Sequence, residues 1–302
     1  MPNTTLLYLK RELEKVLAQS YDVKYPALSA RNIFPIAPES GSGYTQITYK
    51  QFDQVGVAKL FNGNSKDIPV VNLKMKSFTS PVHHIVDAFT YDKFDLEKDM
   101  ATNKSLDSRL TNAARRAALK EENDIAFQGD DDFNLPGLFS NSNIPNAVNA
   151  TGIEGSTEID DNKTAEEIVS DIVTLVNDVN DNTLGVELAD SLAFPISTYN
   201  YLAGRTFGAA MPGMFILDAL KKALPQIKNW YSCPELETAG VGSTKAMVAY
   251  TKNADNMALQ IPVEFQQDAP EYANFTYTVN CRQDTGGLIV FYPLSVNIAY
   301  GI

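Results

Sequence analysis

The sequence predicts an α+β protein in which one long helix lies between strand-rich regions and a compact unit of mixed structure. Three observations predict this class. Residues 105–128 repeat Leu and Ala at helical spacing, residues 44–80 and 260–302 have strand patterns, and residues 164–259 alternate between strand and helix patterns. The chain has 302 residues, of which 44% are hydrophobic and 21% charged, so it can bury a core.

Composition excludes several classes of function. The net charge of −12 argues against a nucleic-acid-binding surface over most of the molecule. The first residues lack the apolar run of a signal peptide, and no window approaches the ~20 apolar residues of a membrane span. Cys233 and Cys281 are far apart and lack metal-ligand spacing, so we interpret them as buried reduced thiols of a cytosolic chain.

The N-terminal part predicts an arm and a hairpin. Residues 4–19 have the spacing of a short amphipathic helix, and residues 20–43 are rich in Pro and Gly with few periodic apolar residues. Residues 44–80 contain two strand-like runs around the turn signal at residues 62–64. This hairpin is polar on much of both faces, and an isolated hairpin is marginal in water, so it should lie on something else.

The long helix from Ser105 to Gln128 is the central element. It would extend about 36 Å at roughly 1.5 Å per residue, with Gly129 as a natural end. A strand over residues 82–94 should precede it, after Pro81 breaks the hairpin pattern. The apolar stripe of the helix is mostly alanine, so we expect the face with Ala113 and Ala117 to pack closely against the neighbouring sheet.

The remaining chain predicts an inserted unit and terminal strands. Thr164 and Glu167 form a capping box that opens a helix through Asp178. Residues 164–259 then alternate between strands and helices, as in a compact α/β unit. Residues 260–302 are all strand-like, so we expect them to form a second region with residues 81–163 and to hold the C-terminus in a sheet.

No motif indicates catalysis, a cofactor or a metal. His83 and His84 are adjacent, so on a strand they point to opposite faces and cannot share a metal ion. No zinc-ligand spacing, nucleophile elbow, phosphate loop or dinucleotide-binding motif occurs in a suitable context. We therefore expect no enzymatic activity and no cofactor.

The acidic turn after the long helix resembles a calcium loop only in part. Asp130, Asp132 and Asn134 match the first half of the loop. Leu135 stands where the loop needs glycine, and Asn141 where it needs glutamate. The segment is therefore interpreted as a solvated turn.

The order of these parts resembles the tailed-phage major capsid protein with the Hong Kong-97-type fold, which encapsulin shells share. The segments AARRAALKEENDIAFQGDDDFNLPGLFSN and TGGLIVFYPLSVNIAYGI also resemble one branch of that family. The resemblance implies an N-terminal arm (1–43), an E-loop hairpin (44–80), a P-domain with the spine helix (81–163 and 260–302) and an inserted A-domain (164–259). We expect the arm to become ordered only through contacts with other subunits.

The function that the resemblance implies is structural. The chain would assemble with itself, as pentamers and hexamers, into an icosahedral virion capsid that encloses a double-stranded DNA phage genome without sequence-specific binding. Assembly would occur in the host bacterial cytoplasm, with portal, scaffolding and decoration proteins as candidate further partners. Two alternatives stay open. One is an encapsulin-type compartment enclosing cargo enzyme, and the other is a soluble enzyme or binding protein whose site is not recognised.

Charge predicts a contact between subunits. The hairpin is net basic, and its lysines are Lys50, Lys59, Lys66, Lys74 and Lys76. The densest acidic stretch is at the end of the long helix, with Glu121, Glu122, Asp124, Asp130, Asp131 and Asp132. The hypothesis is that the hairpin of one subunit lies over this acidic end of its neighbour. The alternative is a plain solvated acidic end. Some relatives cross-link an E-loop lysine to an asparagine of a neighbour, but no partner asparagine can be named here.

Overall fold

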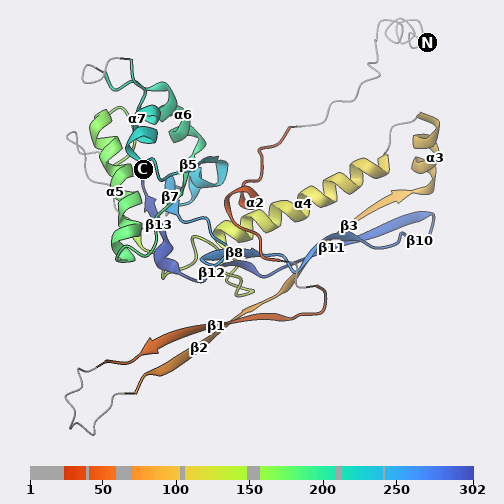
Figure 1. Cartoon of the computed structure of the whole chain (residues 1–302). Coiled ribbons are helices and arrows are strands. Elements are labelled where there is room, and N and C mark those ends of the chain that lie inside the picture. The colour runs from red at the N-terminus through yellow and green to blue at the C-terminus, as the bar shows by residue number, and fades with distance from the viewer. Residues whose placement is uncertain are drawn as a thin grey trace, which may run out of the picture.

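The computed structural model describes residues 24–38, 41–58, 70–102, 106–147, 157–208, 213–240 and 242–302. Figure 1 shows an elongated molecule with a domain of helices and strands at the end that holds the C-terminus. The long helix α4 (Leu106–Gln128) leads from this domain toward the opposite end, where the short helix α3 (Lys93–Thr102) lies. Helices and strands are both abundant, which agrees with the predicted α+β class.

The part that we call the stem consists of α4 and the sheet beneath it. β3 (His83–Asp92) pairs antiparallel with β11 (Thr276–Thr285) over the full length of both strands. β9 (Val263–Gln267) and β10 (Glu271–Ala273) pair with β11. α4 ends where the sequence predicts, because Gly129 has a φ of 75°, which a residue with a Cβ rarely adopts.

The alanine face of α4 differs from the predicted one. Ala114 and Ala118 are buried, whereas Ala113 and Ala117 are exposed. Ala114 contacts a small cluster with Val279 of β11. The two alanine pairs are neighbours in the sequence and lie about 100° apart around a helix with 3.6 residues per turn. The predicted buried face was therefore wrong by one residue, which corresponds to a rotation of about 100° around the helix axis.

This correction gives a test with an internal control. Ala114→Leu would insert atoms into the contact with Val279 and is expected to lower the free energy of unfolding by about 1–3 kcal/mol. Ala117→Leu is exposed and is expected to change stability by less than about 0.5 kcal/mol. Thermal unfolding of the two unassembled variants measures the difference. Equal losses of stability would contradict the observed helix rotation.

The segment that follows α4 folds back and satisfies the end of the helix. The Leu138 N–H donates to the Ala126 carbonyl at 3.0 Å, and the Phe139 N–H donates to the Phe127 carbonyl at 2.8 Å. Carbonyls of the last helical turn have no partner within their own helix, so these bonds remove a desolvation cost. The return passes so close that a Cβ on Gly137 would lie 2.2 Å from the Gly129 nitrogen.

The described part of the arm, residues 24–38, packs on its own subunit. In α2 (Ala30–Ile33) and the next residue, Ala30, Ile33 and Phe34 are buried in a core cluster that also contains Phe127 and Tyr250. The arm also bonds to Leu259, whose N–H donates to the Pro35 carbonyl at 2.8 Å. The expectation that the arm is ordered only by other subunits is therefore wrong for residues 24–38. The predicted helix at 4–19 lies outside the described residues.

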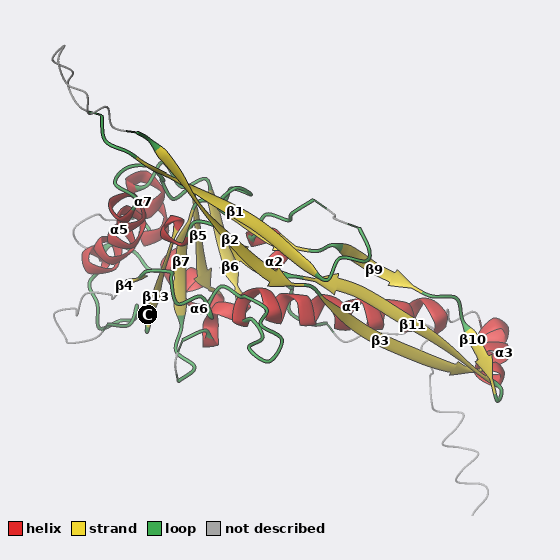
Figure 2. Cartoon of the chain, turned by 90° about the horizontal axis from the view of Figure 1, so that it is seen from below, coloured by secondary structure: helices red, strands yellow, loops and turns green. Residues whose placement is uncertain are grey.

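The predicted hairpin is confirmed. β1 (Gln46–Val55) pairs antiparallel with β2 (Asn72–Pro81), from Gln46 opposite Pro81 to Val55 opposite Asn72. The turn predicted at residues 62–64 lies outside the described residues. Most side chains of both strands are exposed, and the ribbon runs back toward the end that holds the C-terminus (Figures 1 and 2). At its root, Tyr49 stacks on Phe78 and meets Phe291 edge-on, at ring-centroid distances of 5.2 and 4.9 Å.

The other end of the molecule is a domain that we call the head. Its sheet has the strand order β4 (Asn146–Ala147), β13 (Val296–Tyr300), β7 (Ala246–Tyr250), β5 (Ser191–Pro195) and β6 (Asn229–Cys233). Its helices are α5 (Ala165–Asn182), α6 (Ile196–Gly204) and α7 (Ile216–Ala223), with the 3-10 helix η2 (Pro234–Thr238) after β6. Near the stem, β8 (Met257–Gln260) pairs with β12 (Gly287–Val290), and η3 (Pro293–Ser295) leads into β13.

The last strand belongs to the head sheet. β13 pairs antiparallel with β7 and parallel with β4. The prediction that a sheet holds the C-terminus is confirmed, but the grouping of all of 260–302 with the stem strands is wrong for β13. The reason is that β13 supplies buried apolar residues to both faces of the head sheet, with Ile298 in one core cluster and Ala299 in the other.

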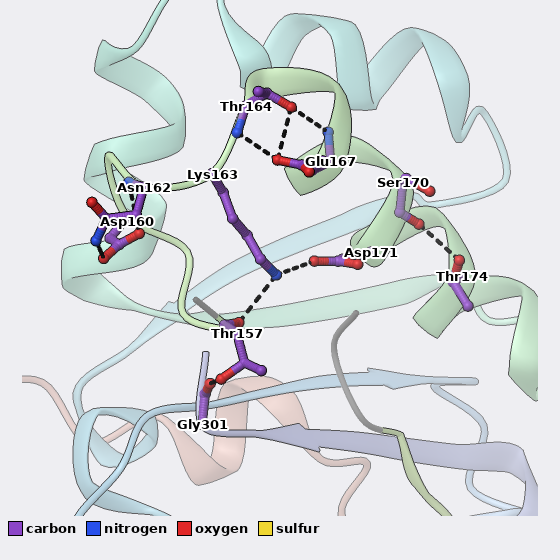
Figure 3. Close-up of polar contacts among 10 residues, drawn as sticks. All are labelled: Thr157, Asp160, Asn162, Lys163, Thr164, Glu167, Ser170, Asp171, Thr174 and Gly301. Carbon is purple, nitrogen blue, oxygen red and sulfur yellow. Dashed lines mark hydrogen bonds and ion pairs between the residues drawn. The ribbon is translucent and has the colours of Figure 1, made fainter. Parts of the chain in front are cut away.

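The entrance to α5 is fixed by polar contacts, which Figure 3 shows. Thr164 and Glu167 form the predicted capping box. Next to it, the Lys163 ammonium, which is fully buried, donates to the Asp171 carboxylate and to the Thr157 carbonyl. Thr157 in turn reaches the chain end, because its hydroxyl donates to the Gly301 carbonyl at 3.4 Å. These contacts hold the segment before α5 against the end of β13.

Candidate functional site

The hairpin surface divides into two chemically different faces. The strand register places Lys50 and Phe52 on one face with Met75, since Phe52 pairs with Met75. Lys74 and Lys76 lie on the other face, with Asp53 directly opposite Lys74. The described lysines therefore do not form one basic surface. Lys59 and Lys66, the other predicted interface lysines, lie outside the described residues.

The acidic end of α4 also divides, and Glu122 is not available for a neighbour. Glu122 is only 1% exposed. Its carboxylate accepts from Arg31 Nε and Nη2, both at 2.7 Å, and from the Gln283 amide. Arg31 also donates to Glu264 at 2.9 and 3.0 Å, and this pairing with two carboxylates raises the pKa of Arg31. Glu122 was therefore wrongly assigned to the subunit interface, because it links the arm, α4 and β11 within one chain.

The other carboxylates near the end of α4 line two different grooves. Glu121 and Asp130 line a groove of about 470 Å³ between β3 and α4, which Phe133 also lines. Asp124 lines a second groove, of about 640 Å³, between the arm and α4, together with the cations Arg116 and Lys120. The structure thus brings Glu121 and Asp130 together and directs Asp124 to a different, more basic surface.

The acidic turn is stabilised by its own first carboxylate. Asp130 Oδ1 accepts the N–H groups of Asp132 and Phe133 at 3.0 and 3.3 Å. Such a bond from a side chain to the backbone two residues on is typical of aspartate in turns. Asp131 and Asp132 are exposed. The turn therefore offers two exposed carboxylates beside the groove that Glu121 and Asp130 line.

The two histidines have separate roles. His83 Nε2 lies 3.1 Å from the Phe133 carbonyl, and His84 Nδ1 lies 2.6 Å from Asp284 Oδ1. The buried Asp284 also pairs with Arg282 at 3.1 Å. Within the described ranges, no group of three or more His, Cys, Asp or Glu side chains could hold a metal ion.

The cysteines are free and buried. Burial raises the pKa of the Cys233 thiol to about 12, so the thiolate that would react is scarce at neutral pH. Of the helices that the structure describes, none has the length and apolar character needed to cross a bilayer.

Comparison with known proteins identifies the family. A family model described as major capsid protein matches residues 56–302, which is most of the chain. The chain belongs to the major capsid protein family. Its function is therefore that of a structural protein of a capsid shell, and it associates with itself in that shell. The family places this capsid protein in a virion capsid.

Solved structures show the same fold. A chain of the capsid of Myoviridae phage XM1 superposes with a TM-score of 0.82 at 19% identity, over 97% of this chain and 98% of that one. A chain from the capsid of a native GTA particle gives a TM-score of 0.66 at 10% identity, over 99% of both chains. A virus-like particle from Pyrococcus furiosus gives 0.51 at 12% identity, over 89% and 90%. No protein with curated annotation matches the sequence significantly.

These matches confirm the predicted Hong Kong-97-type fold and favour the capsid interpretation over both alternatives. Sequence reasoning missed Arg31, because its partners Glu122 and Glu264 lie far along the chain. A signal was present, since Arg31 is one of only two arginines in the first 100 residues, and arginine is rarely buried without a partner.

Proposed function

We propose that this capsid protein forms an icosahedral shell of pentamers and hexamers around a double-stranded DNA phage genome. The observation that supports this most is the full-length similarity to the phage XM1 capsid chain, with a TM-score of 0.82. In this proposal the stem, head and hairpin correspond to the P-domain, A-domain and E-loop. The protein has no catalytic role, it assembles in the host cytoplasm, and portal, scaffolding and decoration proteins are its further partners.

The charge of the chain supports a DNA-containing shell. The net charge is −12, and a negatively charged wall repels the phosphate backbone. DNA can then be packed and released without adhering to the shell. The experiment is nuclease treatment of particles purified from infected host cells, followed by extraction of their contents. Protected double-stranded DNA is expected, whereas a folded enzyme without DNA would favour the encapsulin alternative.

We propose further that the hairpin of one subunit lies against the acidic groove of its neighbour. The hairpin exposes most of its side chains, and Lys74 and Lys76 lie together on one of its faces. The acidic side of the contact consists of Glu121, Asp130, Asp131 and Asp132, without the buried Glu122. Each exposed ion pair contributes only about 0–1 kcal/mol, but a shell repeats the contact in every subunit.

Charge reversal tests this contact. Lys74→Glu with Lys76→Glu should reduce assembly without lowering the thermal stability of the unassembled subunit. Adding Glu121→Lys with Asp131→Lys should restore part of the assembly, as measured by light scattering. Lys24→Glu with Lys93→Glu makes the same change of charge outside the hairpin and serves as the control. Normal assembly of the hairpin variant, or no rescue by the second pair, would show that the two surfaces do not meet.

A further inference from the structure

The turn after α5 holds a leucine in a backbone conformation that disfavours leucine. Thr183 is the C-cap of α5, and Leu184 follows it with a φ of 53°. Glycine is the usual residue directly after a C-cap, because a Cβ is crowded in the left-handed region. The Leu184 side chain is 93% exposed, so packing within the subunit does not compensate for this strain.

Leu184 belongs to an apolar group that we call the turn patch, made of Leu184, Val186 and Leu188. Val186 is 80% exposed and Leu188 is 58% exposed. The backbone beneath the patch is held in place, because the Gly185 N–H donates to the Asn180 carbonyl at 2.8 Å. The Glu187 N–H likewise donates to the Thr183 hydroxyl at 3.1 Å. The turn patch is therefore a fixed apolar surface rather than a loose chain segment.

The charges beside the turn patch are negative, and a pair of positive charges lies on another helix of the head. Asp181 and Glu187 flank the patch, and α5 contains no lysine or arginine. The last turn of α7 carries Lys221 and Lys222, which are both exposed. Among the described residues, none of these four side chains forms an ion pair. The head thus has an acidic apolar surface and a basic surface that are complementary in charge.

Both surfaces lie at the same end of the head. Residues 183–190 connect α5 to β5, and residues 224–228 connect α7 to β6. β5 and β6 are parallel, with Ser191 opposite Asn229. The two connections therefore arrive at the same end of these strands, where both strands begin. A second copy that is rotated about an axis can therefore place its α7 end at the level of the turn patch. Such a contact between two different surfaces closes into a ring when the rotation closes.

We propose that the turn patch is a docking site for a second copy of this chain, with Lys221 and Lys222 of that copy against Asp181 and Glu187. This inference rests on the proposed shell function and assigns one of its contacts. This contact explains why a leucine occupies position 184, because its strained backbone and exposed side chain would serve the assembled state only.

The first test uses opposite effects on stability and assembly. Asparagine tolerates the left-handed region better than leucine does, so Leu184→Asn should raise the thermal midpoint of the unassembled subunit. The same variant should need a roughly tenfold higher protein concentration to assemble, because a desolvated anchor is lost. Leu184→Gly should behave in the same way. A leucine that served only the fold would give a lower midpoint in both variants, which would overturn the proposal.

The second test exchanges the charges. Asp181→Lys and Lys222→Glu should each reduce assembly, and the double variant should restore it. Glu166→Lys reverses a charge at the start of the same helix and should leave the assembly concentration unchanged. If the wild-type protein assembles and all of these variants assemble equally well, the turn patch is not a contact. If the wild-type protein itself forms no shell, the proposed function fails instead.

Discussion

Lys163→Met is expected to lower the free energy of unfolding of the head by about 3–5 kcal/mol. The Lys163 and Asp171 side chains are almost completely buried, and they pair with each other (Figure 3). Removing one member of a buried ion pair leaves the other charge without compensation in a poorly solvated place, which is the costly change. Thermal unfolding of the unassembled subunit, with the calorimetric enthalpy, measures this loss.

The matched control for Lys163 is the double variant Lys163→Met with Asp171→Leu. Replacing both members of a buried pair by apolar residues of similar size is often neutral, so the double variant should recover most of the stability. A double variant as unstable as the single one would show that packing around Lys163, rather than its charge, stabilises the entrance to α5. A single variant as stable as the wild type would contradict the buried pair altogether.

Glu122→Ala is expected to lower the free energy of unfolding by about 3 kcal/mol, the lower end of the range for breaking a buried pair. The lower end applies because the Arg31 side chain is 30% exposed and can regain water. The variant also leaves the Gln283 amide without its acceptor. Because Arg31 then loses its main anchor, hydrogen exchange of residues 24–38 should become faster.

Glu264→Ala is the matched control for Glu122. Glu264 also accepts hydrogen bonds from Arg31, but its side chain is 42% exposed. The pair is therefore closer to a surface ion pair, and its loss should cost about 0–1 kcal/mol. Similar losses for Glu122→Ala and Glu264→Ala would contradict the assignment of Glu122 as the central acceptor.

Elements with a strong local signal could be predicted from the sequence. The capping box of Thr164 and Glu167 is a property of nearby residues in the sequence, and it is confirmed. The long helix α4 ends at Gln128 because the glycine after it permits a turn. By contrast, α3 has almost no apolar stripe and was predicted in part as strand, since residues at its start continue the pattern of β3.

Features that depend on distant residues could not be predicted. The burial of Ala114 rather than Ala113 depends on where β11 lies. Adjacent alanines are chemically the same, so the sequence carries little information about which side of α4 faces the sheet. Glu121 and Glu122 are adjacent residues of the same type, yet only Glu122 accepts hydrogen bonds from Arg31, which is 91 positions away. The arm packs for the same reason, because the Tyr250 hydroxyl donates to the Ile33 carbonyl across 217 positions.

The candidate interface was predictable only in outline. The sequence shows that the hairpin is basic and the α4 end acidic, and both regions are largely exposed apart from Glu122. The division of the hairpin lysines between two faces follows from the strand register, which depends on the pairing of β1 with β2. Leu184 escaped notice because a leucine after a helix is unremarkable until its φ is known.

This chain is expected to build a closed shell, and electron microscopy of the purified full-length protein is the direct test. The protein would be expressed alone, purified in low salt and imaged, with sedimentation velocity as a parallel measurement. Closed particles of uniform diameter are expected or, before closure, rings of five and six copies. A stable monomer over the whole accessible range of protein concentration and salt, together with saturable binding of a small molecule, would contradict it.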